Sequence, residues 1–378
     1  MVALGDSLTA GYEPDLATQP APVPYGFADR IKEQGLYHGR TELANYGILG
    51  LKSEGLAHYV SAIQEGRQPA PDEIQVGLSD PRIAQFAAGT TQAKADIEAA
   101  NLITITIGGN DVKSLLQEAG KLADSDLEAK LKTLIDAYTA NLTQALTNLR
   151  TMNPQALIVV ADQYQPVPEL VGAASYAKLE KAAGAFTEAT DAVVAGFAGQ
   201  TGQVKVAHVA AAFVGNELSF THILEGDIHP KQAGYEAIAK VFSEVIWGDY
   251  RQTRAALGQE AISIVVGGQE LLTPNKPILK NGQTFIAIGD IIQATHAVSN
   301  WDSRNGSLSL TYQGNKVVIP IGSKTIQVNG EKVSTAAPAF LQKAGSNSKT
   351  YVPLALLAKG LGFDVQYSSK VKTVFINL

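Results

Sequence analysis

The chain contains no cysteine. This absence excludes disulfide bonds, catalysis by a thiolate and zinc sites that depend on cysteine ligands. The sequence also lacks any run of about 18 apolar residues, so we expect no membrane-spanning helix. No basic start followed by an apolar stretch and a cleavage site is present. The apolar run from Val2 begins directly after Met1, as it would if a leader had been removed, although a cytoplasmic protein could begin in the same way.

The sequence also lacks an excess of positive charge. Thirty Lys and Arg residues stand against 36 Asp and Glu residues, which gives a formal net charge of −6. Nothing in this balance supplies the concentrated positive field that binds a phosphate backbone. We therefore expect no nucleic-acid partner.

The length and composition are those of a globular protein with two domains. The chain has 378 residues, whereas single domains commonly contain about 100–200. Hydrophobic residues make up 45% of the chain and charged residues 17%, which does not indicate disorder. The sequence pattern changes near Gly258, and we predict one domain over residues 1–256 and a second over residues 260–378.

In the first domain, short apolar runs alternate with long amphipathic stretches, which is typical of an α/β fold. The expected core strands are nearly continuous in apolar residues, which suits a parallel sheet covered on both faces. These strands are Val2–Leu4, Leu102–Ile107, Leu157–Val160 and Val204–Val209. Apolar residues on one side predict three long helices. These helices are Asp126–Arg150, Tyr176–Phe197 and Lys231–Tyr250.

The second domain is expected to be a smaller, β-rich α+β domain. Asn-Gly pairs at Asn281, Asn305 and Asn329 suit tight hairpin turns. The segment Thr284–Ala287 matches Thr350–Pro353, and each is followed by a short helical stretch. Two degenerate copies of one unit are therefore expected.

Two segments that follow expected strands carry candidate catalytic residues. Gly5–Leu8 follows the first strand, and Gly108–Asp111 follows the second. Because sites in open parallel sheets lie at the carboxyl ends of the strands, Ser7 is placed to act as a nucleophile and the neutral amide of Asn110 to donate to an oxyanion. Both segments have a second interpretation. Asp6 and Ser7 are residue types that commonly cap the N-terminus of a helix, and the residue types of Gly108–Asp111 favour a turn.

Two further segments complete the candidate site. In Asn45–Gly50, the backbone N–H of Gly50 can face the same place. In Asp227–Pro230, His229 has the side chain whose pKa suits proton transfer near neutrality, and a neighbouring carboxylate can hold its tautomer. The other five histidines lack comparable neighbours, and we expect surface or core positions for His38, His58, His208, His222 and His296.

Together, these segments resemble the SGNH hydrolases, also called GDSL esterases and lipases, in the family's order over roughly residues 1 to 250. The resemblance implies a three-layer α/β/α fold with a flavodoxin-like parallel sheet. It also implies ester hydrolysis through an acyl-enzyme, with no cofactor or metal ion. In that mechanism Ser7 is the nucleophile and His229 the base. The oxyanion hole would be formed by Ser7, Gly50 and Asn110.

One position departs from the family pattern. The family usually places its triad acid three residues before the histidine, where this sequence has Gly226. Three groups are left to orient the imidazole: Asp227 through a changed loop, the Gly226 carbonyl, and Glu225. Glu225 is the least favoured, because its chain would have to fold back over Gly226. We predict that Asp227 completes the catalytic triad with Ser7 and His229.

The second domain resembles the copper amine oxidase N-terminal-like repeat domain found on secreted and surface proteins of Gram-positive bacteria. The resemblance rests on the paired segments described above, the Asn329-Gly330 hairpin and the Trp301-Asp302 strand. No copper is implied, because His296 is the only histidine of this region and cysteine is absent. We expect this domain either to bind the cell wall or a polysaccharide, or to support the hydrolase and bind nothing.

The resulting hypothesis is a bacterial serine esterase, extracellular or attached to the cell surface, that acts on short acyl or acetyl esters. No apolar helix looks like a lid over a lipid site. A polysaccharide O-deacetylase is the alternative, and thioesterase and lysophospholipase activities suit the same residues. The departure at Gly226 also allows a non-catalytic wall protein with a relic hydrolase domain, although the survival of the other site residues argues against it.

Overall fold

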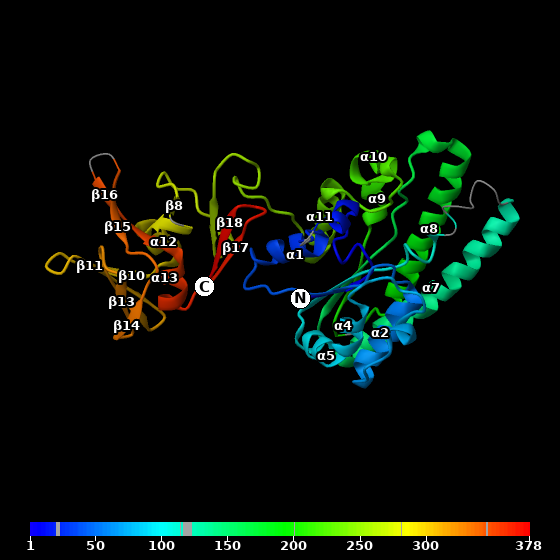
Figure 1. Ribbon diagram of the computed structural model, residues 1–378, viewed down its shortest axis with the longest axis horizontal. Coiled ribbons are helices and arrows are strands. Elements are labelled where there is room, and N and C mark those ends of the chain that lie inside the picture. The colour runs from blue at the N-terminus through cyan, green and yellow to red at the C-terminus, as the bar shows by residue number, and fades with distance from the viewer. Residues whose placement is uncertain (20–22, 114, 116–122, 200, 281, 345–346) are drawn as a thin grey trace. The chain divides into compact units, whose positions relative to one another are not determined.

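The structure is a computed structural model that describes residues 1–378 except 20–22, 114, 116–122, 200, 281 and 345–346 (Figure 1). The chain divides into two compact units. The first comprises Met1–Lys32 and Glu42–Tyr250, and the second comprises Glu33–Thr41 and Arg251–Leu378. The second unit thus starts earlier than the predicted residue 260 and includes a short segment from near the start of the chain.

That short segment belongs to the second unit because of its apolar side chains. Leu36 and Tyr37 are buried in one cluster with Val265 and Phe375. The rings of Tyr37 and Phe375 meet edge to face, with centroids 5.2 Å apart. A contact between positions so far apart in the sequence produces no change of composition, so it could not be read from the sequence.

The first unit is built on a five-stranded parallel sheet with strand order β2-β1-β3-β4-β5. The strands are β1 (Val2–Gly5), β2 (Ala44–Gly47), β3 (Leu102–Thr106), β4 (Leu157–Ala161) and β5 (Val204–Ala207). Four of them confirm the strands predicted from apolar runs. The exception is β2, whose segment is not a continuous apolar run and was not predicted as a strand.

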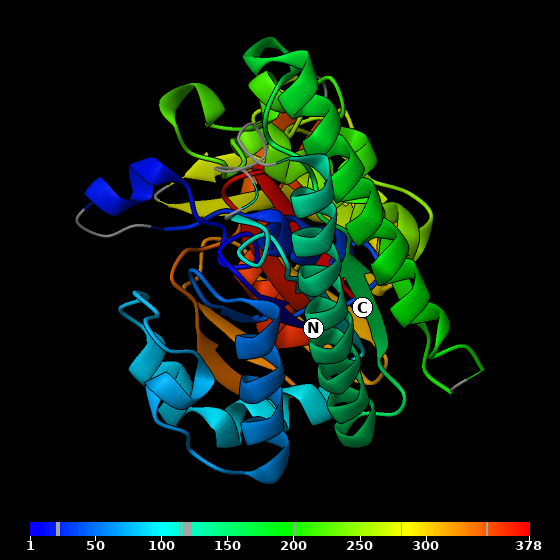
Figure 2. The same cartoon turned by 90° about the vertical axis from the view of Figure 1, so that its right-hand side faces the viewer.

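Helices cover both faces of this sheet, as the three-layer prediction requires (Figure 1). Side chains alternate between the faces of a strand, and on β1 the residues Val2 and Leu4 join one apolar cluster whereas Ala3 joins another. The first cluster includes residues of α2 (Ser53–Glu65), α7 (Asp124–Met152) and α8 (Ala173–Ala195). The second includes residues of α1 (Phe27–Gly35) and α11 (Gln232–Trp247). The long helices α7 and α8 lie side by side (Figure 2).

The helices α7, α8 and α11 confirm the three predicted from periodicity, with ends that shift by a turn or less. Shorter helices of the unit include α3 (Pro71–Ile74), α4 (Ile83–Ala88), α5 (Thr90–Ala99), α9 (Val209–Phe213) and α10 (Glu217–Phe220). Three 3₁₀ turns are η1 (Pro14–Thr18), η2 (Glu169–Val171) and η3 (Ile223–Glu225). None of the described helices in the chain has the length and apolar character needed to cross a membrane.

The second unit is β-rich, with mostly antiparallel sheets of order β10-β11-β12-β13-β14, β15-β16-β9-β8 and β17-β18-β6-β7. Its strands are β6 (Ser263–Val266), β7 (Gln269–Glu270), β8 (Ile278–Lys280), β9 (Gln283–Ala287), β10 (Val298–Asp302), β11 (Ser307–Tyr312), β12 (Asn315–Pro320), β13 (Thr325–Val328), β14 (Glu331–Ser334), β15 (Phe340–Ala344), β16 (Asn347–Pro353), β17 (Asp364–Ser368) and β18 (Thr373–Asn377). Its helices include α12 (Ile288–Thr295) and α13 (Leu354–Leu361).

The predicted repeat is visible in this order of elements. The succession β9, α12, β10 is matched by β16, α13, β17, and β9 pairs with β16 so that Ile286 lies opposite Val352. Asn329, with a φ of 52°, and Gly330 form the turn between β13 and β14, as the Asn-Gly pair predicts. Asn281 lies outside the described residues.

Candidate active site

Ser7 lies two residues after the end of β1, at the carboxyl edge of the sheet. Gly5 ends the strand with a φ of 136°, and a Cβ atom there would lie 2.0 Å from the carbonyl oxygen of Thr106, so this position requires glycine. The next residue, Asp6, is buried, and its Oδ1 accepts the N–H of Leu8 and the hydroxyl of Thr106, each at 3.0 Å. These contacts fix the turn that presents Ser7 to a pocket.

The structure brings Ser7, His229 and Asp227 into one line of hydrogen bonds. His229 Nε2 lies 2.8 Å from Ser7 Oγ, and His229 Nδ1 lies 2.5 Å from Asp227 Oδ1. The same Asp227 oxygen accepts the backbone N–H of His229 at 2.8 Å. With Nδ1 donating to the carboxylate, Nε2 is free to accept the proton of the serine hydroxyl.

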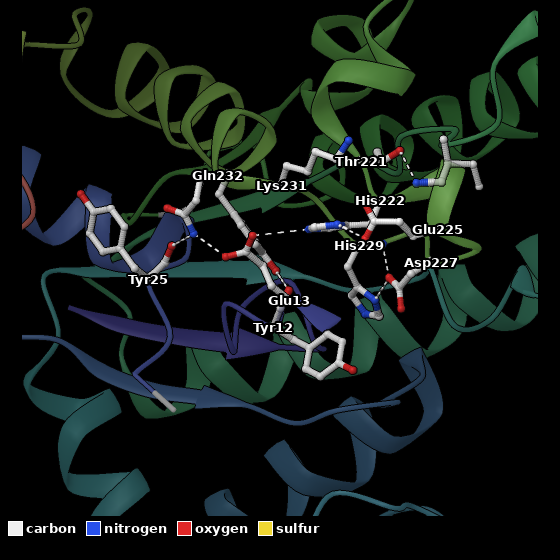
Figure 3. A network of polar contacts seen from close by, with 12 residues as sticks. Tyr12, Glu13, Tyr25, Thr221, His222, Glu225, Asp227, His229, Lys231 and Gln232 are labelled. Atoms are coloured by element: carbon white, nitrogen blue, oxygen red, sulfur yellow. Dashed lines mark hydrogen bonds and ion pairs between the residues drawn. The ribbon is translucent and has the colours of Figure 1, made fainter. Parts of the chain in front are cut away.

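The other two groups considered for orienting the imidazole form no hydrogen bond with its Nδ1 among the described residues. Glu225 Oε2 lies 3.0 Å from Nδ1 of a second histidine, His222 (Figure 3). Within the ranges that the structure describes, the His229 ring forms no hydrogen bond with the carbonyl of Gly226, a residue with a left-handed φ of 80°. In the described part of the chain, the group that accepts the hydrogen bond from Nδ1 of His229 is therefore the Asp227 carboxylate.

The surroundings of His229 suit a general base. Burial lowers the pKa of His229 from its usual value, and Lys113 and His222 act in the same direction, whereas the Asp227 carboxylate raises it. The net lowering keeps the imidazole neutral near pH 7, which is the form that can accept a proton. The ring of Tyr12 packs edge-on against the imidazole, with ring centroids 4.6 Å apart.

The three groups expected to stabilise an oxyanion lie on different segments. Within the described residues, no acceptor bonds to the backbone N–H of Ser7 or of Gly50, which has a φ of 79°. Asn110 lines the pocket together with Ser7, and its amide donates to the Leu51 carbonyl at 3.0 Å. This bond joins the third segment to the loop that carries Gly50, and it leaves a second amide hydrogen of Asn110 for a ligand.

Two acidic side chains beside the site have raised pKa values. Burial raises the pKa of Asp6 to about 7, and the nearby Asp111 adds to the effect, against the hydrogen bonds from Leu8 and Thr106. Burial also raises the pKa of Asp111, although its carboxylate accepts the N–H and hydroxyl of Ser53. Among the described residues, no group of three or more His, Asp or Glu side chains is arranged to hold a metal ion.

A pocket of about 380 Å³ opens beside Ser7, with His229 in its polar part. Its apolar walls are formed by Leu8, Val112, Leu115, Pro166, Val167, Leu179, Ala182, Ala183, Phe186, Ile223 and Ile228. Leu179, Ala182 and Phe186 recur at helical spacing, so one face of α8 forms a wall of the pocket. The volume is at the lower end of the range of about 300–1,000 Å³ that is usual for small-molecule sites.

Two residues that the sequence did not single out as functional hold the loop around Ile228. Tyr164 donates its hydroxyl to the Ile228 carbonyl at 2.9 Å and stacks on Phe213, with ring centroids 4.0 Å apart. His222, expected at a surface or core position, is bonded through its backbone to the same loop. No motif marks either residue, because each acts through contacts that form only in the folded chain.

A serine, a histidine and an aspartate hydrogen-bonded in line, at the carboxyl edge of a parallel α/β sheet, have the arrangement of a serine hydrolase site. A sequence profile of the GDSL-like lipase/acylhydrolase family matches residues 1–242. The chain belongs to this family, and it is a carboxylic ester hydrolase. A profile of the copper amine oxidase N-terminal domain matches residues 265–376, which confirms the resemblance of the second region.

Several solved structures are similar to the chain. A lipase from a goat rumen metagenome is 22% identical, with 64% of this chain and 94% of that chain covered and a TM-score of 0.43. An acetyl xylan esterase from Geobacillus stearothermophilus is 15% identical, with coverages of 67% and 96% and a TM-score of 0.39. A phospholipase A1 from Streptomyces albidoflavus is 16% identical, with coverages of 64% and 97% and a TM-score of 0.40. A search of curated proteins found no match.

Proposed function

We propose that the first unit hydrolyses carboxylic esters through an acyl-enzyme formed on Ser7. The observation that supports this most strongly is the hydrogen-bonded line from Asp227 through His229 to Ser7. As Ser7 Oγ attacks the ester carbonyl carbon, its proton passes to His229 Nε2, and Asp227 holds the resulting imidazolium. The tetrahedral oxyanion accepts hydrogen bonds from the N–H groups of Ser7 and Gly50 and from the Asn110 amide.

The reaction is completed in two further steps. When the tetrahedral intermediate collapses, the bond to the leaving oxygen breaks and His229 returns its proton to the departing alcohol. A water molecule then gives a proton to His229 and attacks the acyl group on Ser7. Release of the carboxylic acid restores the hydroxyl of Ser7 and the neutral imidazole.

We propose further that the acyl part of the substrate is an apolar chain of medium length. Support comes from the walls of the pocket, because an acetyl group would leave most of the space beside Leu179, Ala182 and Phe186 unfilled. Burial of each additional methylene is worth about 0.8 kcal/mol, which corresponds to roughly a fourfold gain in kcat/KM. This proposal favours longer chains than the short acyl or acetyl groups expected from the sequence.

A series of p-nitrophenyl esters tests both proposals. We would measure kcat/KM for the acetate, butyrate, octanoate and palmitate, with Ser7→Ala as the control for spontaneous and non-specific hydrolysis. We expect turnover that Ser7→Ala abolishes and a maximum beyond the acetate. Activity that survives in Ser7→Ala would contradict the acyl-enzyme. A maximum at the acetate, joined by activity on acetyl xylan, would instead favour the polysaccharide O-deacetylase.

For the second unit we propose binding to a polysaccharide. Trp301 on β10 and Tyr367 on β17 occupy equivalent positions in the two repeats, and both side chains are exposed. Exposed aromatic rings with a polar edge suit contact with a partly polar ligand. Co-sedimentation of the full chain with insoluble xylan or peptidoglycan should fall in the variant carrying Trp301→Ala and Tyr367→Ala, but not in Leu279→Ala, which removes another exposed side chain of this unit. Equal binding by all three proteins would contradict the proposal.

A further inference from the structure

A second histidine lies between two carboxylates next to the loop that carries Asp227 and His229 (Figure 3). The His222 side chain is only 9% exposed. Its Nδ1 lies 3.0 Å from Glu225 Oε2, and its Nε2 lies 3.5 Å from Glu13 Oε2. Each nitrogen of this buried ring therefore faces an acidic oxygen.

The backbone of His222 closes the loop that follows it. Its N–H donates to the carbonyl of His229 at 3.0 Å, and its carbonyl accepts the N–H of Asp227 at 3.2 Å. Thr221 and Pro230, which flank the bond between His222 and His229, form an isolated β-bridge. His222 thus bonds directly to both residues that continue the line of hydrogen bonds from Ser7.

Glu13 anchors the ring of His222 to the nucleophile segment. The preceding residue, Tyr12, donates its N–H to the Ser7 carbonyl at 3.0 Å. The other carboxylate oxygen of Glu13, Oε1, accepts the side-chain amide of Gln232 at 2.5 Å, at the start of α11 (Figure 3). The hydrogen bond from Gln232 therefore fixes the Glu13 carboxylate that contacts His222.

We propose that His222 is a positioning residue, held by Glu13 and Glu225, that keeps the loop in the conformation in which Asp227 reaches His229. Since Asp227 stands only two residues before His229, its carboxylate contacts both the backbone N–H and the ring of that residue. The loop must turn tightly for this contact. The backbone bonds of His222 close the turn, and its ring, held between Glu13 and Glu225, fixes the position of that backbone. This inference rests on the proposed function, in which Asp227 orients the general base.

A double-mutant cycle tests the inference. His222→Ala should lower kcat about 10- to 100-fold, because small displacements of a catalytic group cost rates of this order. KM should change less than kcat, since Ile223 and Ile228 of this loop form only part of the apolar walls and those on α8 are untouched. In an Asp227→Ala background the same substitution should have almost no further effect, because the contact that it supports is already absent.

The pH profile supplies a second readout. The charged or titratable groups that act on the pKa of His229 include Lys113, Asp227 and His222, and Tyr12 packs against its ring. Asp227 raises this pKa more than His222 lowers it. Loosening the contact with Asp227 should therefore move the acid limb of kcat/KM to lower pH, in the same direction as Asp227→Ala.

The controls separate the possible failures. His208→Ala changes another histidine that contacts a carboxylate, with Nδ1 3.2 Å from Asp162, and it should leave kcat unchanged. If His222→Ala does not fold, Glu13→Gln tests the same connection with a side chain of equal size, and the same non-additivity is expected. Equal losses in the wild-type and Asp227→Ala backgrounds would overturn the positioning role. Full activity of Asp227→Ala would instead overturn the proposed function.

Discussion

Replacing Asp6 with asparagine should stabilise the first unit, and the gain should grow with pH. The Asp6 carboxyl is 2% exposed and accepts hydrogen bonds from the Leu8 N–H and the Thr106 hydroxyl. An asparagine side chain has nearly the same shape, and its oxygen can accept both bonds. It carries no charge at any pH, so the substitution removes the cost of burying a carboxylate.

The sign and size of the effect follow from the pKa. Burial raises the pKa of Asp6 from 3.8 to about 7 in the folded chain. A raised pKa means that the carboxyl contributes its full stability below about pH 4 and loses it as the pH rises toward 7. At about 1.4 kcal/mol for each unit of pKa difference, the total loss is about 4 kcal/mol above pH 7 and about 2 kcal/mol at pH 5. The advantage of Asp6→Asn should therefore grow by about 2–3 kcal/mol between pH 5 and pH 8.

Urea unfolding measures this advantage. The chain has two tryptophans, and Trp301 lies in the second unit, so Trp301→Phe leaves Trp247 of α11 as the reporter for the first unit. In that background, the free energy of unfolding is compared with and without the Asp6→Asn substitution at pH 5 and pH 8. An advantage that stays constant between the two pH values would refute the reasoning, because it would mean that ionisation of the buried carboxyl carries no cost.

Asp80→Asn is the matched control. The Asp80 side chain is also buried, but it forms an ion pair with Arg82 at 2.7 Å and accepts the N–H of Leu49. Although burial acts to raise it, these bonds hold the pKa of Asp80 below its usual value. The ionised Asp80 therefore stabilises the unit at pH values above the pKa that its carboxyl has in the unfolded chain, and this stabilisation is lost in acid. Asp80→Asn should therefore destabilise the unit at both test pH values.

Three other substitutions give separate predictions. Asp227→Asn should lower kcat by about 10²–10⁴-fold, because the asparagine amide favours the wrong tautomer of His229; steady-state kinetics with an unchanged KM would check this. Asn110→Ala should lower kcat by about 10²–10³-fold, and a loss confined to KM would contradict its role as an oxyanion donor. Ala182→Met should fill part of the pocket and move the optimum of the ester series to shorter chains, at roughly fourfold in kcat/KM for each methylene excluded. An unchanged chain-length profile would show that the acyl group binds elsewhere.

The predictability of the fold differed between strands for a physical reason. Buried strands such as β1 and β4 are continuous in apolar residues, and this pattern is visible in the sequence. The strand β2 is held in a different way. The Asn45 side chain donates to the Thr9 carbonyl at 2.7 Å and accepts the N–H of Gly47 at 2.9 Å. Polar residues that bond to the backbone of other segments resemble loop residues in a sequence, so β2 was missed.

The site residues that could be predicted from the sequence have reactive or polar side chains and lie just after apolar strands. Ser7 and Asn110 follow apolar strands, and the geometry of parallel sheets brings such positions together. Residues that support the site from loops could not be found in this way. His222 and Tyr164 are defined by bonds to a loop whose course depends on the packing of α11 and on the nucleophile segment, and neither has a spacing rule.

The departure at Gly226 shows how local conformation compensates for a changed spacing. With a left-handed φ of 80°, Gly226 turns the chain immediately before Asp227. A Cβ atom at position 226 would meet nothing within 4 Å, so the site leaves space for a side chain there but the backbone conformation disfavours one. The turn brings the Asp227 carboxylate to both the backbone and the ring of His229. The glycine at the usual position of the acid is therefore part of the reason that an acid one residue later can reach the imidazole.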